Sequence, residues 1–529
     1  MNRTLRTFLK RQVRPSALII FSIAVFLLIY GAYYAAKSSS VEVLALSTIA
    51  CIALIVQMIA FYLMKSKGFP QSNLWAFTIA LFMWGGIFML IFTPFSVPDE
   101  VYHFIAAYQL SDILLLNGPG DGQSLPMRSE DLELLDNLPY TLSVSRDAYP
   151  VVIDGLLDSE VQSDMVNYAY SSIPSSLAEN PIQDRLAPAI GITISRILGL
   201  NATLTFYAGR ICSLVLFVTI IHFAVKHIPL GKPAMMSASL LPMALHLAGS
   251  YSYDSFTIAI TFLFIALIME MIIGKQEITG KQVVVATVVA ALLAPCKVVY
   301  SPCVFLVLFA KKELFKSKRD SLIAKSTIIG AALVSLMAFK AVDLLPMVIN
   351  PIEGSAVDIR GNEAGEFYDL AYAIQNPAST MMVYLRTMIS KIEHMTRATV
   401  GGELGWFQEN ISASTYIIVA IYSVLMLSCF SEQKKNFMLS TKLRTACAVI
   451  AAICWIAVMT SMFIGWTFIT ENEIQGIQGR YIVPILPLIL IAISPQRIRC
   501  GYNLGFWCPF LMCSVNAMYI IHIASNSML

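Results

Sequence analysis

The fold is decided by runs such as VLALSTIACIALIVQMIAFYLM, which occupies residues 43–64. This run contains no charged side chain, and about 20 consecutive apolar residues are enough for a helix to cross the hydrocarbon core of a bilayer. Similar apolar runs occupy residues 17–36, 74–92, 256–273 and 448–466. We therefore expect helices that cross a membrane several times.

The composition of the whole chain supports the same conclusion. Of 529 residues, 57% are apolar and 13% are charged, and the mean hydropathy is +0.70. In soluble domains, roughly a quarter of the residues are charged. About thirteen segments fit the length needed to span a bilayer, so the predicted fold class is an all-α polytopic membrane protein with two large exterior loops. The first apolar run lacks a clear small-residue cleavage site and is expected to be a retained helix.

The distribution of basic residues predicts the orientation. Short loops rich in Lys and Arg stay in the cytoplasm, and five basic residues precede the first span: Arg3, Arg6, Lys10, Arg11 and Arg14. With that end inside, 23 of the 36 Lys and Arg residues fall in cytoplasmic segments. Residues 96–202 fall outside and carry fifteen Asp or Glu, four Arg and no Lys. We expect a multi-pass protein of the bacterial cytoplasmic (inner) membrane, with a cytoplasmic amino terminus.

The chain divides into five parts. Three spans (1–95) precede a first exterior loop (96–202), middle spans (203–344), a second exterior loop (345–412) and the C-terminal spans (413–529). Residues 100–116 and 378–395 have helical apolar patterns that fit helices lying along the membrane interface. Residues 283–310 fit either one tilted span or two short elements broken near 295–302, where Pro295 and Pro302 flank Lys297.

Asp99 and Glu100 are the first candidate functional residues. They follow Pro98 at the outer end of the third span, and carboxylates so close to hydrocarbon are costly unless they are paired or solvated. A carboxylate there can take a proton as a general base. The alternative is structural, because proline and acidic residues also favour the first turn of a helix. His103 is one turn further on and shares their face.

Further charged residues are expected near the outer leaflet. Arg210, Lys297 and Arg480 are cations that suit a phosphate, and Asp254 is another carboxylate at the start of a span. Structural alternatives exist for three of them: Arg210 pairs with an acid or reaches the interface, Asp254 caps its helix, and Arg480 anchors a span. Lys297 favours a functional role, because a lysine at a break in a helix has few structural uses.

Several classes of ligand are not supported by the sequence. No clustered basic and aromatic residues indicate a nucleic acid. The ten cysteines lack the spacing of a metal site and imply no disulfide framework. No cofactor is predicted, no metal-binding residue is assigned, and a need for a divalent cation is left open. We find no internal repeat of the kind typical of transporters.

Seven short motifs occur in order along the chain. They are Pro98-Asp-Glu with His103, Arg185-Leu-Ala-Pro-Ala with Gly191 and Arg196-Ile-Leu-Gly199, Tyr207-Ala-Gly-Arg210, Ser252-Tyr-Asp254, Cys296-Lys-Val-Val-Tyr300, Leu404-Gly-Trp406 and Gln478-Gly-Arg-Tyr481. From about residue 75 to 500, the chain resembles an uncharacterised bacterial family of predicted membrane proteins that is placed in the GT-C glycosyltransferase superfamily. The resemblance implies an enzyme that transfers a sugar from a polyprenyl-phosphate donor.

The resemblance also implies roles for individual residues. An acidic residue in the first exterior loop of that superfamily activates the acceptor hydroxyl, which here falls on Asp99, with Glu100 as the neighbouring candidate. Arg210, Lys297 and Arg480 match the positions that hold the donor phosphate, and Trp406 matches one that stacks on a sugar. The remaining substrate-binding candidates are His103, Asp254, Tyr300 and Tyr481. Two departures stand out: two spans precede the helix before the acidic loop, and residues 180–185 lack the Tyr and Pro usual near Gln183.

The function hypothesis is an inverting transfer of a sugar to a cell-surface glycan or lipid-linked acceptor outside the membrane. The alternatives are a flippase or transporter for lipid-linked glycans, a surface-polysaccharide polymerase or ligase, and a non-catalytic assembly subunit. The predicted partners are the lipid-linked donor, the acceptor and the bilayer. The site requires Asp99 and its cations to lie within about 15 Å of one another, because proton transfer and phosphate contacts act at hydrogen-bond distance around one substrate.

Overall fold

The computed structural model describes residues 15–38, 41–66, 71–117, 124–138, 144–145, 147–158, 164–169, 182–349, 367–406, 411–432, 439–495 and 499–527. The five basic residues that precede the first span and the Gly-rich run 354–366 lie outside these ranges. Most of the described chain is helical, and its strands form two small two-stranded sheets, β1-β2 and β3-β4. The predicted all-α fold class is confirmed.

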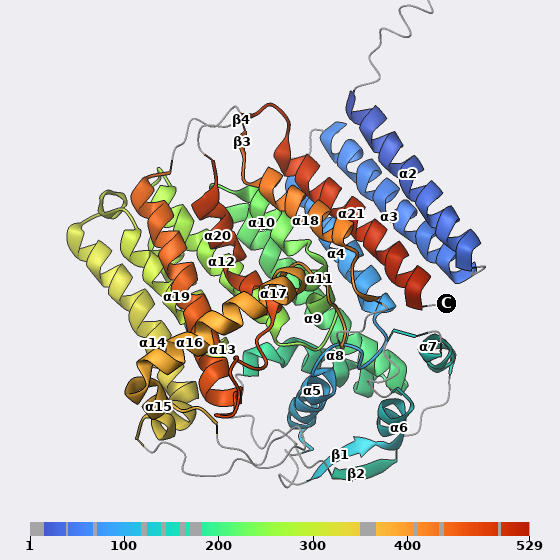
Figure 1. Ribbon diagram of the computed structural model, residues 1–529, viewed down its shortest axis with the longest axis horizontal. Helices are drawn as coiled ribbons and strands as arrows, with labels where there is room; N and C mark the ends of the chain where they lie inside the picture. The colour runs from blue at the N-terminus through green and yellow to red at the C-terminus, as the bar shows by residue number, and fades with distance from the viewer. Residues whose placement is uncertain are drawn as a thin grey trace, which may run out of the picture.

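The helices follow one another along the chain as antiparallel rods (Figure 1). The N-terminal part has α2 (Pro15–Ser38), α3 (Val41–Ser66) and α4 (Ser72–Ile91). The middle part has α9 (Ala202–His227), α10 (Lys232–Ser239), α11 (Pro242–Ala248), α12 (Asp254–Ile273), α13 (Gly280–Cys296), η2 (Val298–Phe309), η3 (Lys312–Leu314) and α14 (Lys318–Ile349). The last part has α15 (Leu370–Gln375), α16 (Pro377–Ser390), α17 (Ile392–Thr399), α18 (Thr415–Ser428), β3 (Ser431–Glu432), α19 (Thr441–Trp466), η5 (Gly479–Ile485), α20 (Leu486–Ile493), β4 (Arg499–Cys500) and α21 (Leu504–Ser527).

Seven helices of the described chain are long and apolar enough to cross a membrane, judged by length and composition. They lie within α3, α4, α9, α12, α14, α19 and α21. Shorter apolar helices of 10–17 residues accompany them, among them α13, η2, α18 and the η5–α20 unit. The protein is therefore polytopic, while the total of about thirteen crossings stays a prediction.

The stretch 283–310 is a broken pair of elements and not one span. The α-helix α13 ends at Cys296, the backbone of Lys297 is extended, and the 3-10 helix η2 begins at Val298. Pro295 and Pro302 each lack the N–H that a continuous α-helix would need. The break places Lys297 between two helix ends, close to the start of α12.

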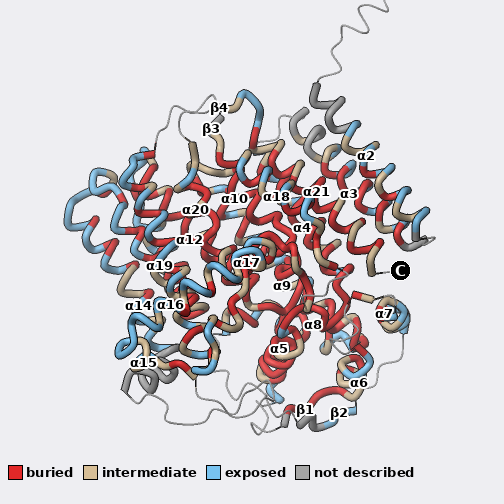
Figure 2. Tube along the Cα trace, viewed as in Figure 1, coloured by how far each residue is buried: buried red, intermediate tan, exposed pale blue. Residues whose placement is uncertain are grey.

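The helix α12 forms the centre of the molecule. Within its membrane-spanning segment 89% of the residues are buried, against 22% for α14 at the periphery. Figure 2 shows this contrast as a buried interior surrounded by α2, α3 and α14 with exposed outer faces. Because protein surrounds most of α12, the packing of this helix fixes the position of Asp254 at its first turn.

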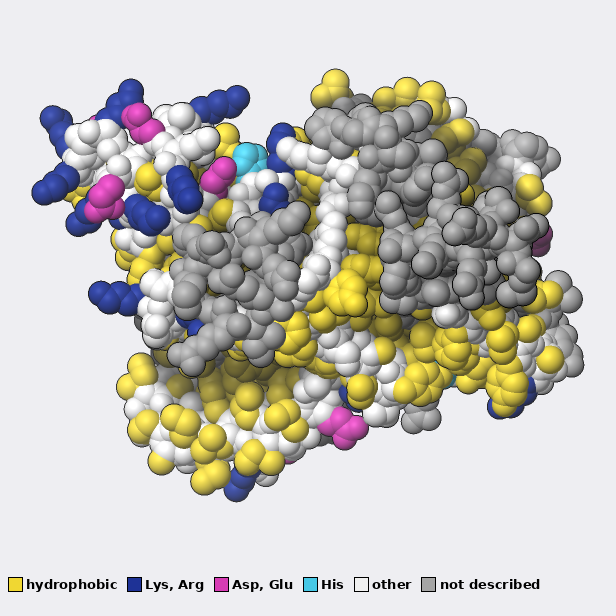
Figure 3. Space-filling view, turned by 90° about the horizontal axis from the view of Figure 1, so that it is seen from above, with side chains coloured by type: hydrophobic (Ala, Val, Ile, Leu, Met, Phe, Trp, Pro, Cys, Tyr) yellow, Lys and Arg dark blue, Asp and Glu magenta, His cyan; other side chains and the backbone are white. Residues whose placement is uncertain are grey.

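One end of the molecule gathers exposed basic residues. Figure 3, seen from above, shows Lys and Arg side chains concentrated at one corner, on the side where α14 begins in Figure 1. The exposed basic residues at the start of α14 and just before it are Lys311, Lys312, Lys316, Lys318 and Arg319. This corner lies at the opposite end from α5, as expected if the two ends face opposite sides of a membrane.

A layer of short elements covers the other end of the bundle, and we call it the cap layer. It comprises α5 (Glu100–Leu114), β1 (Ser124–Arg128), α6 (Ser129–Asn137), α7 (Ala148–Leu157), β2 (Met165–Ala169), η1 (Ile182–Asp184) and α8 (Leu186–Ile197). Strands β1 and β2 pair antiparallel, with Ser124 opposite Ala169.

Two helices predicted to lie along the interface differ from that expectation. Eleven residues of α5 are buried, so it is enclosed by the cap layer and the bundle and does not lie on a membrane surface. Its apolar pattern reflects packing against α8 and α9, including the rings of Phe104 and Phe206, whose centroids lie 5.2 Å apart at an interplanar angle of 45°. The predicted helix over 378–395 is interrupted at Lys391 and forms α16 and α17.

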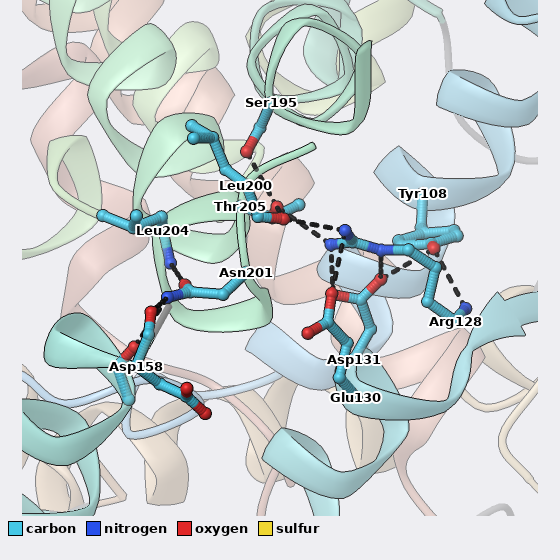
Figure 4. Close-up of polar contacts among 11 residues, drawn as sticks. Tyr108, Arg128, Glu130, Asp131, Asp158, Ser195, Leu200, Asn201, Leu204 and Thr205 are labelled. Carbon is cyan, nitrogen blue, oxygen red and sulfur yellow. Dashed lines mark hydrogen bonds and ion pairs between the residues drawn. The ribbon is translucent and has the colours of Figure 1, made fainter. Parts of the chain in front are cut away.

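A buried arginine holds the cap layer on the bundle (Figure 4). The guanidinium of Arg128 donates two hydrogen bonds to Asp131, at 2.8 and 2.9 Å, one to the carbonyl of Leu200 at 2.8 Å and one to the hydroxyl of Thr205 at 3.0 Å. The hydroxyl of Tyr108 donates to the same carboxylate at 2.8 Å. One side chain thereby links β1, α6, α5 and the start of α9.

Gly191 brings α8 into direct contact with α9. A Cβ atom at this position would lie 2.3 Å from the carbonyl oxygen of Ala208 and 2.8 Å from the Cα atom of Gly209. Any other residue must push the two helix backbones apart, because neither contacting atom belongs to a flexible side chain. The close crossing therefore depends on glycine.

We predict that Gly191→Ala lowers the free energy of unfolding by about 1–3 kcal/mol, the usual cost of overpacking. The matched control is Gly86→Ala in α4, where no atom lies within 4 Å of the added Cβ. That change should leave stability unchanged or raise it by up to about 1 kcal/mol, the helix propensity gained. Thermal unfolding of the detergent-purified proteins measures both, and equal effects at the two glycines would contradict the prediction.

Candidate functional site

Asp99 stands at the position preceding α5 in an unusual backbone conformation. Its φ of 63° and ψ of 9° are left-handed, and its side chain caps no backbone N–H of the helix. The carboxylate instead accepts a hydrogen bond from Nη2 of Arg480 at 3.2 Å, and 53% of the side chain is exposed. The structural alternative holds for Glu100, which lies in the first turn of α5, whereas the side chain of Asp99 does not cap the helix. Left-handed residues other than glycine cost about 1–3 kcal/mol and concentrate at functional sites.

Glu100 has a different environment, although it is the next residue. Its carboxylate is fully buried and accepts two hydrogen bonds from Arg210, from Nε at 2.9 Å and from Nη2 at 2.6 Å. It also accepts one from the backbone N–H of Tyr251 at 3.2 Å. A carboxylate enclosed in this way is not accessible to a substrate.

Arg210 uses all of its N–H groups inside the protein. Besides its two bonds to Glu100, it donates to the carbonyls of Met89, Phe92 and Thr93 at the end of α4. A guanidinium has five donors, and five contacts are made. Arg210 therefore has no N–H group left to bind the phosphate of a sugar donor, contrary to the expectation from the sequence. We assign Arg210 and Glu100 to positioning Asp99.

Asp254 joins the two remaining cations. Its Oδ1 lies 2.5 Å from Nζ of Lys297, and its Oδ2 lies 3.4 Å from Nε of Arg480. Since Arg480 also binds Asp99, four side chains form a continuous row with alternating charge, which we call the charge row: Asp99, Arg480, Asp254 and Lys297. These residues come from α5, η5, α12 and the break after α13. Distances between neighbours are far below the 15 Å that the site requires.

Aromatic side chains surround the inner end of the charge row. Nζ of Lys297 lies 4.6 Å from the ring centroid of Tyr253 and 4.5 Å from that of Tyr481. The hydroxyl of Tyr300 donates to the backbone carbonyl of Tyr481 at 2.8 Å, so Tyr300 supports the ring of Tyr481. Tyr253 was not among the candidate site residues predicted from the sequence, although it lies inside the motif Ser252-Tyr-Asp254.

His103 lies beside the charge row as a neutral side chain. The pKa of His103 is lowered to about 4, chiefly by burial, while Asp99 and Asp254 raise it and Arg480 and Lys297 lower it. Its ring lies 4.7 Å from that of Tyr253 at an interplanar angle of 83°. An imidazole that is neutral at pH 7 cannot serve as a cation for phosphate, so among the candidates this role falls to Lys297 and Arg480.

Trp406 reaches the site from the segment between α17 and α18. Its indole Nε1 lies 3.4 Å from the carbonyl oxygen of Phe95, four residues before Asp99. Its neighbour Gly405 lies with its backbone N 3.4 Å from Nε2 of His246. The predicted stacking on a sugar stays a prediction, while the structure brings this residue to the segment that leads to Asp99.

Asp184 is a candidate that the sequence analysis missed. It is buried at the end of η1, and the thiol of Cys296 and the charges of Lys297 and Asp254 act on its carboxyl group. The preceding Gln183 lies within 3.4 Å of the carbonyl of Leu292 near the end of α13. Burial raises the pKa of Asp184 to about 7. Its presence in the segment 180–185, where this chain departs from the family it resembles, was the available signal.

No group of three His, Cys, Asp or Glu side chains that could hold a metal ion occurs within the described ranges. The need for a divalent cation stays untested.

The comparisons with known proteins identify a family. The family model described as Predicted membrane protein (DUF2142) matches residues 82–489, which is most of the chain and includes every candidate from Asp99 to Tyr481. The chain belongs to this family. No curated protein and no solved structure matches the chain, and none of these findings ties it to the GT-C glycosyltransferase superfamily.

We predict that Glu100→Gln and Arg210→Met each lower the free energy of unfolding by about 3–5 kcal/mol, because each leaves one buried charge without its partner. The double variant should lose at least about 1 kcal/mol less than the sum, because it leaves neither charge behind. Unfolding of the purified proteins in detergent measures all three. Additive losses would show that the pair does not act as a unit.

We predict that Asp184 makes stability fall as the pH rises from about 4 to about 7. In this interval the folded carboxyl group keeps its proton, while the unfolded one, with a pKa of about 3.9, loses it. The slope for one proton is at most about 1.4 kcal/mol per pH unit, and it vanishes above the folded pKa. Thermal unfolding between pH 4 and 8 should show this slope, and Asp184→Asn should remove it. The control is Asp136→Asn, a change of an exposed residue of α6; an unchanged slope in Asp184→Asn would contradict the prediction.

Proposed function

We propose that this member of the predicted membrane protein family is a glycosyltransferase that uses a polyprenyl-phosphate sugar as its donor. The acceptor is a cell-surface glycan or a lipid-linked glycan outside the cytoplasmic membrane of a bacterium. The observation that supports this proposal most is the charge row, in which the half-exposed carboxylate of Asp99 contacts the buried Arg480. Asp254 links Arg480 to the partly buried Lys297. The orientation with the cap layer outside is part of the proposal.

Asp99 acts as the general base in this proposal. Its carboxylate takes the proton of the acceptor hydroxyl while the hydroxyl oxygen attacks the anomeric carbon. The bond between that carbon and the phosphate oxygen breaks, and the lipid phosphate leaves with the electron pair. One displacement inverts the configuration at the anomeric carbon. Of the two neighbouring carboxylates only Asp99 has an exposed side chain, since Glu100 is enclosed.

Lys297 and Arg480 receive the phosphate in this proposal. The two described contacts of Arg480 use Nη2 and Nε, so its Nη1 makes no hydrogen bond to any described residue. Lys297 donates to one carboxylate with one of its three N–H groups. Asp254 holds both cations in place without using all of their donors. Positive charge arranged in advance in a site of low dielectric stabilises the charge that develops on a leaving phosphate.

The distribution of buried charges favours this proposal over a transporter. A translocation path places ionisable residues through the depth of the bilayer. In the described chain the charge row, Glu100, Arg210 and Asp184 all lie where α4, α9, α12 and α13 meet the cap layer. At the opposite end, the described charges include the pair of His227 with Glu270, whose side chains are one third exposed. They also include the buried Lys325, which donates to the carbonyls of Leu308 and Ala310.

We predict that Asp99→Asn lowers the rate of sugar transfer by roughly 10²- to 10⁴-fold, the usual contribution of a positioned base. The assay uses membranes containing the full chain and a panel of radiolabelled polyprenyl-phosphate sugars, with nuclear magnetic resonance of the product to establish inversion. Asp136→Asn, an exposed carboxylate of α6 in the same cap layer, is the control that should keep full activity.

Two outcomes would contradict the proposal at different levels. Full transfer by Asp99→Asn would remove Asp99 from the role of base and leave the reaction class standing. In the second outcome, the unchanged protein transfers no sugar from any donor of the panel and moves a lipid-linked glycan across the membrane. That result would contradict the enzyme and indicate a flippase.

A further inference from the structure

The helix α8 has an apolar row on its outer face. Leu186, Ile190, Ile194 and Ile197 are exposed by 39, 40, 51 and 68%. Their spacing of four, four and three residues places them on one side of an α-helix. No polar side chain interrupts the row, and the neighbouring Leu198 is also exposed.

The inner face of α8 carries polar and small residues together with one large apolar side chain, the buried Ile192. Gly191 contacts the backbone of α9, and the hydroxyl of Ser195 lies 2.7 Å from that of Thr205. Arg196 forms an ion pair with the buried Asp112 at 2.8 Å. A surface helix in water shows the opposite pattern, with its apolar stripe toward the protein and its polar face outward. The surroundings of the outer face of α8 are therefore apolar.

The lipid bilayer is the apolar medium that the position of α8 indicates. The helix crosses α9 at Ala208, one turn before Ile211, which is 44% exposed on a helix long enough to span a membrane. On the other side, Gln183 contacts α13 at Leu292, one turn after the exposed Val288. The two apolar helices that this segment contacts thus each carry an exposed apolar residue about one turn from the contact. Figure 1 shows α8 beside the cap-layer end of α9.

The length of α8 excludes a transmembrane position. Its twelve residues rise about 18 Å, against the roughly 30 Å of the hydrocarbon core. A short helix with one apolar face fits a position in the plane of the interface, with that face about 5–10 Å into the boundary between head groups and acyl chains.

We propose that α8 lies in the membrane interface on the cap-layer side, with Leu186, Ile190, Ile194 and Ile197 inserted among the lipid acyl chains. Gly191 and the ion pair of Arg196 fix the helix rigidly to the protein, so the depth of α8 sets the depth of the residues beside it. Asp184 precedes the helix by two residues, and Gln183 contacts α13 at Leu292, five residues before Lys297. The inner end of the charge row is then held at the level of the lipid head groups. This inference does not depend on the proposed transfer reaction.

The test measures the depth of single nitroxide labels in the full chain reconstituted into phosphatidylcholine and phosphatidylglycerol vesicles. The background protein carries Cys212→Ser and Cys500→Ser. These are the two cysteines of the chain that are partly exposed, and the other eight are buried. Labels are attached in Ile190→Cys and Ile194→Cys. Val215→Cys, on the exposed side of α9, is the lipid reference, and Asp136→Cys on α6 is the water reference. Thermal unfolding must match the background protein before a variant is used.

The expected result is that both α8 labels collide with oxygen several-fold more often, relative to a water-soluble nickel chelate, than the label at position 136 does. Their ratio should approach that of position 215. Preferential collision with the nickel chelate would place the row in water and overturn the proposal. Low collision with both reagents would show that another polypeptide, such as a second copy of this chain, covers the row, and would overturn it equally.

Discussion

The buried ion pair of Glu100 and Arg210 is the constraint on which the geometry of the site depends. It joins the first residue of α5 to α9, and through the carbonyls that Arg210 binds it joins both to the end of α4. The third bond of the carboxylate goes to Tyr251, three residues before Asp254. One pair therefore fixes the residue before it, Asp99, and the segment that leads to Asp254. Replacement of a buried pair by apolar residues often leaves stability unchanged or raises it, so stability alone does not account for two charges at this depth. The fixed positions that the pair gives to Asp99 and Asp254 account for it.

In the charge row, the negative charge of Asp254 compensates the positive charges of two neighbouring cations. Two cations held together without an anion would repel each other and lose their hydration, and at a buried position that cost amounts to several kcal/mol per charge. Asp254 lies between Lys297 and Arg480 and removes this cost. Because it contacts only part of each cation, the phosphate of the proposed reaction would meet N–H groups that Asp254 does not use. Asp99 binds the outer end of Arg480 and keeps half of its side chain exposed. The row thus has one half-exposed end at Asp99 and a more enclosed end at Lys297.

The sequence predicted the features that local chemistry determines. Apolar runs identified the helices, and two prolines around Lys297 identified the break between α13 and η2. The ordered motifs contained all members of the charge row, because each stands at the end of an apolar run where a charge is conspicuous. Sequence alone could not distinguish Arg210 from Arg480, since the difference lies in partners more than a hundred residues away. It also could not identify Asp184, whose properties come from burial and not from its neighbours along the chain. The inverted pattern of α8 was missed because an exposed apolar face and a buried one give the same periodicity.

The backbone of Asp99 connects the ion pair to the chemistry. A left-handed residue other than glycine is strained, and Asp and Asn tolerate this conformation better than most because their short polar side chains bond locally. Here the side chain makes no such local bond and reaches Arg480 instead, so the strain is not relieved by the residue itself. The two ends that flank it must therefore hold it. On one side the chain follows α4, whose last carbonyls bind Arg210, and on the other side Glu100 binds the same guanidinium. The backbone of Asp99 is held on both sides by contacts to Arg210, so it cannot relax to a conformation in which its side chain caps the helix. It is held with its side chain directed at the charge row and half of its surface exposed.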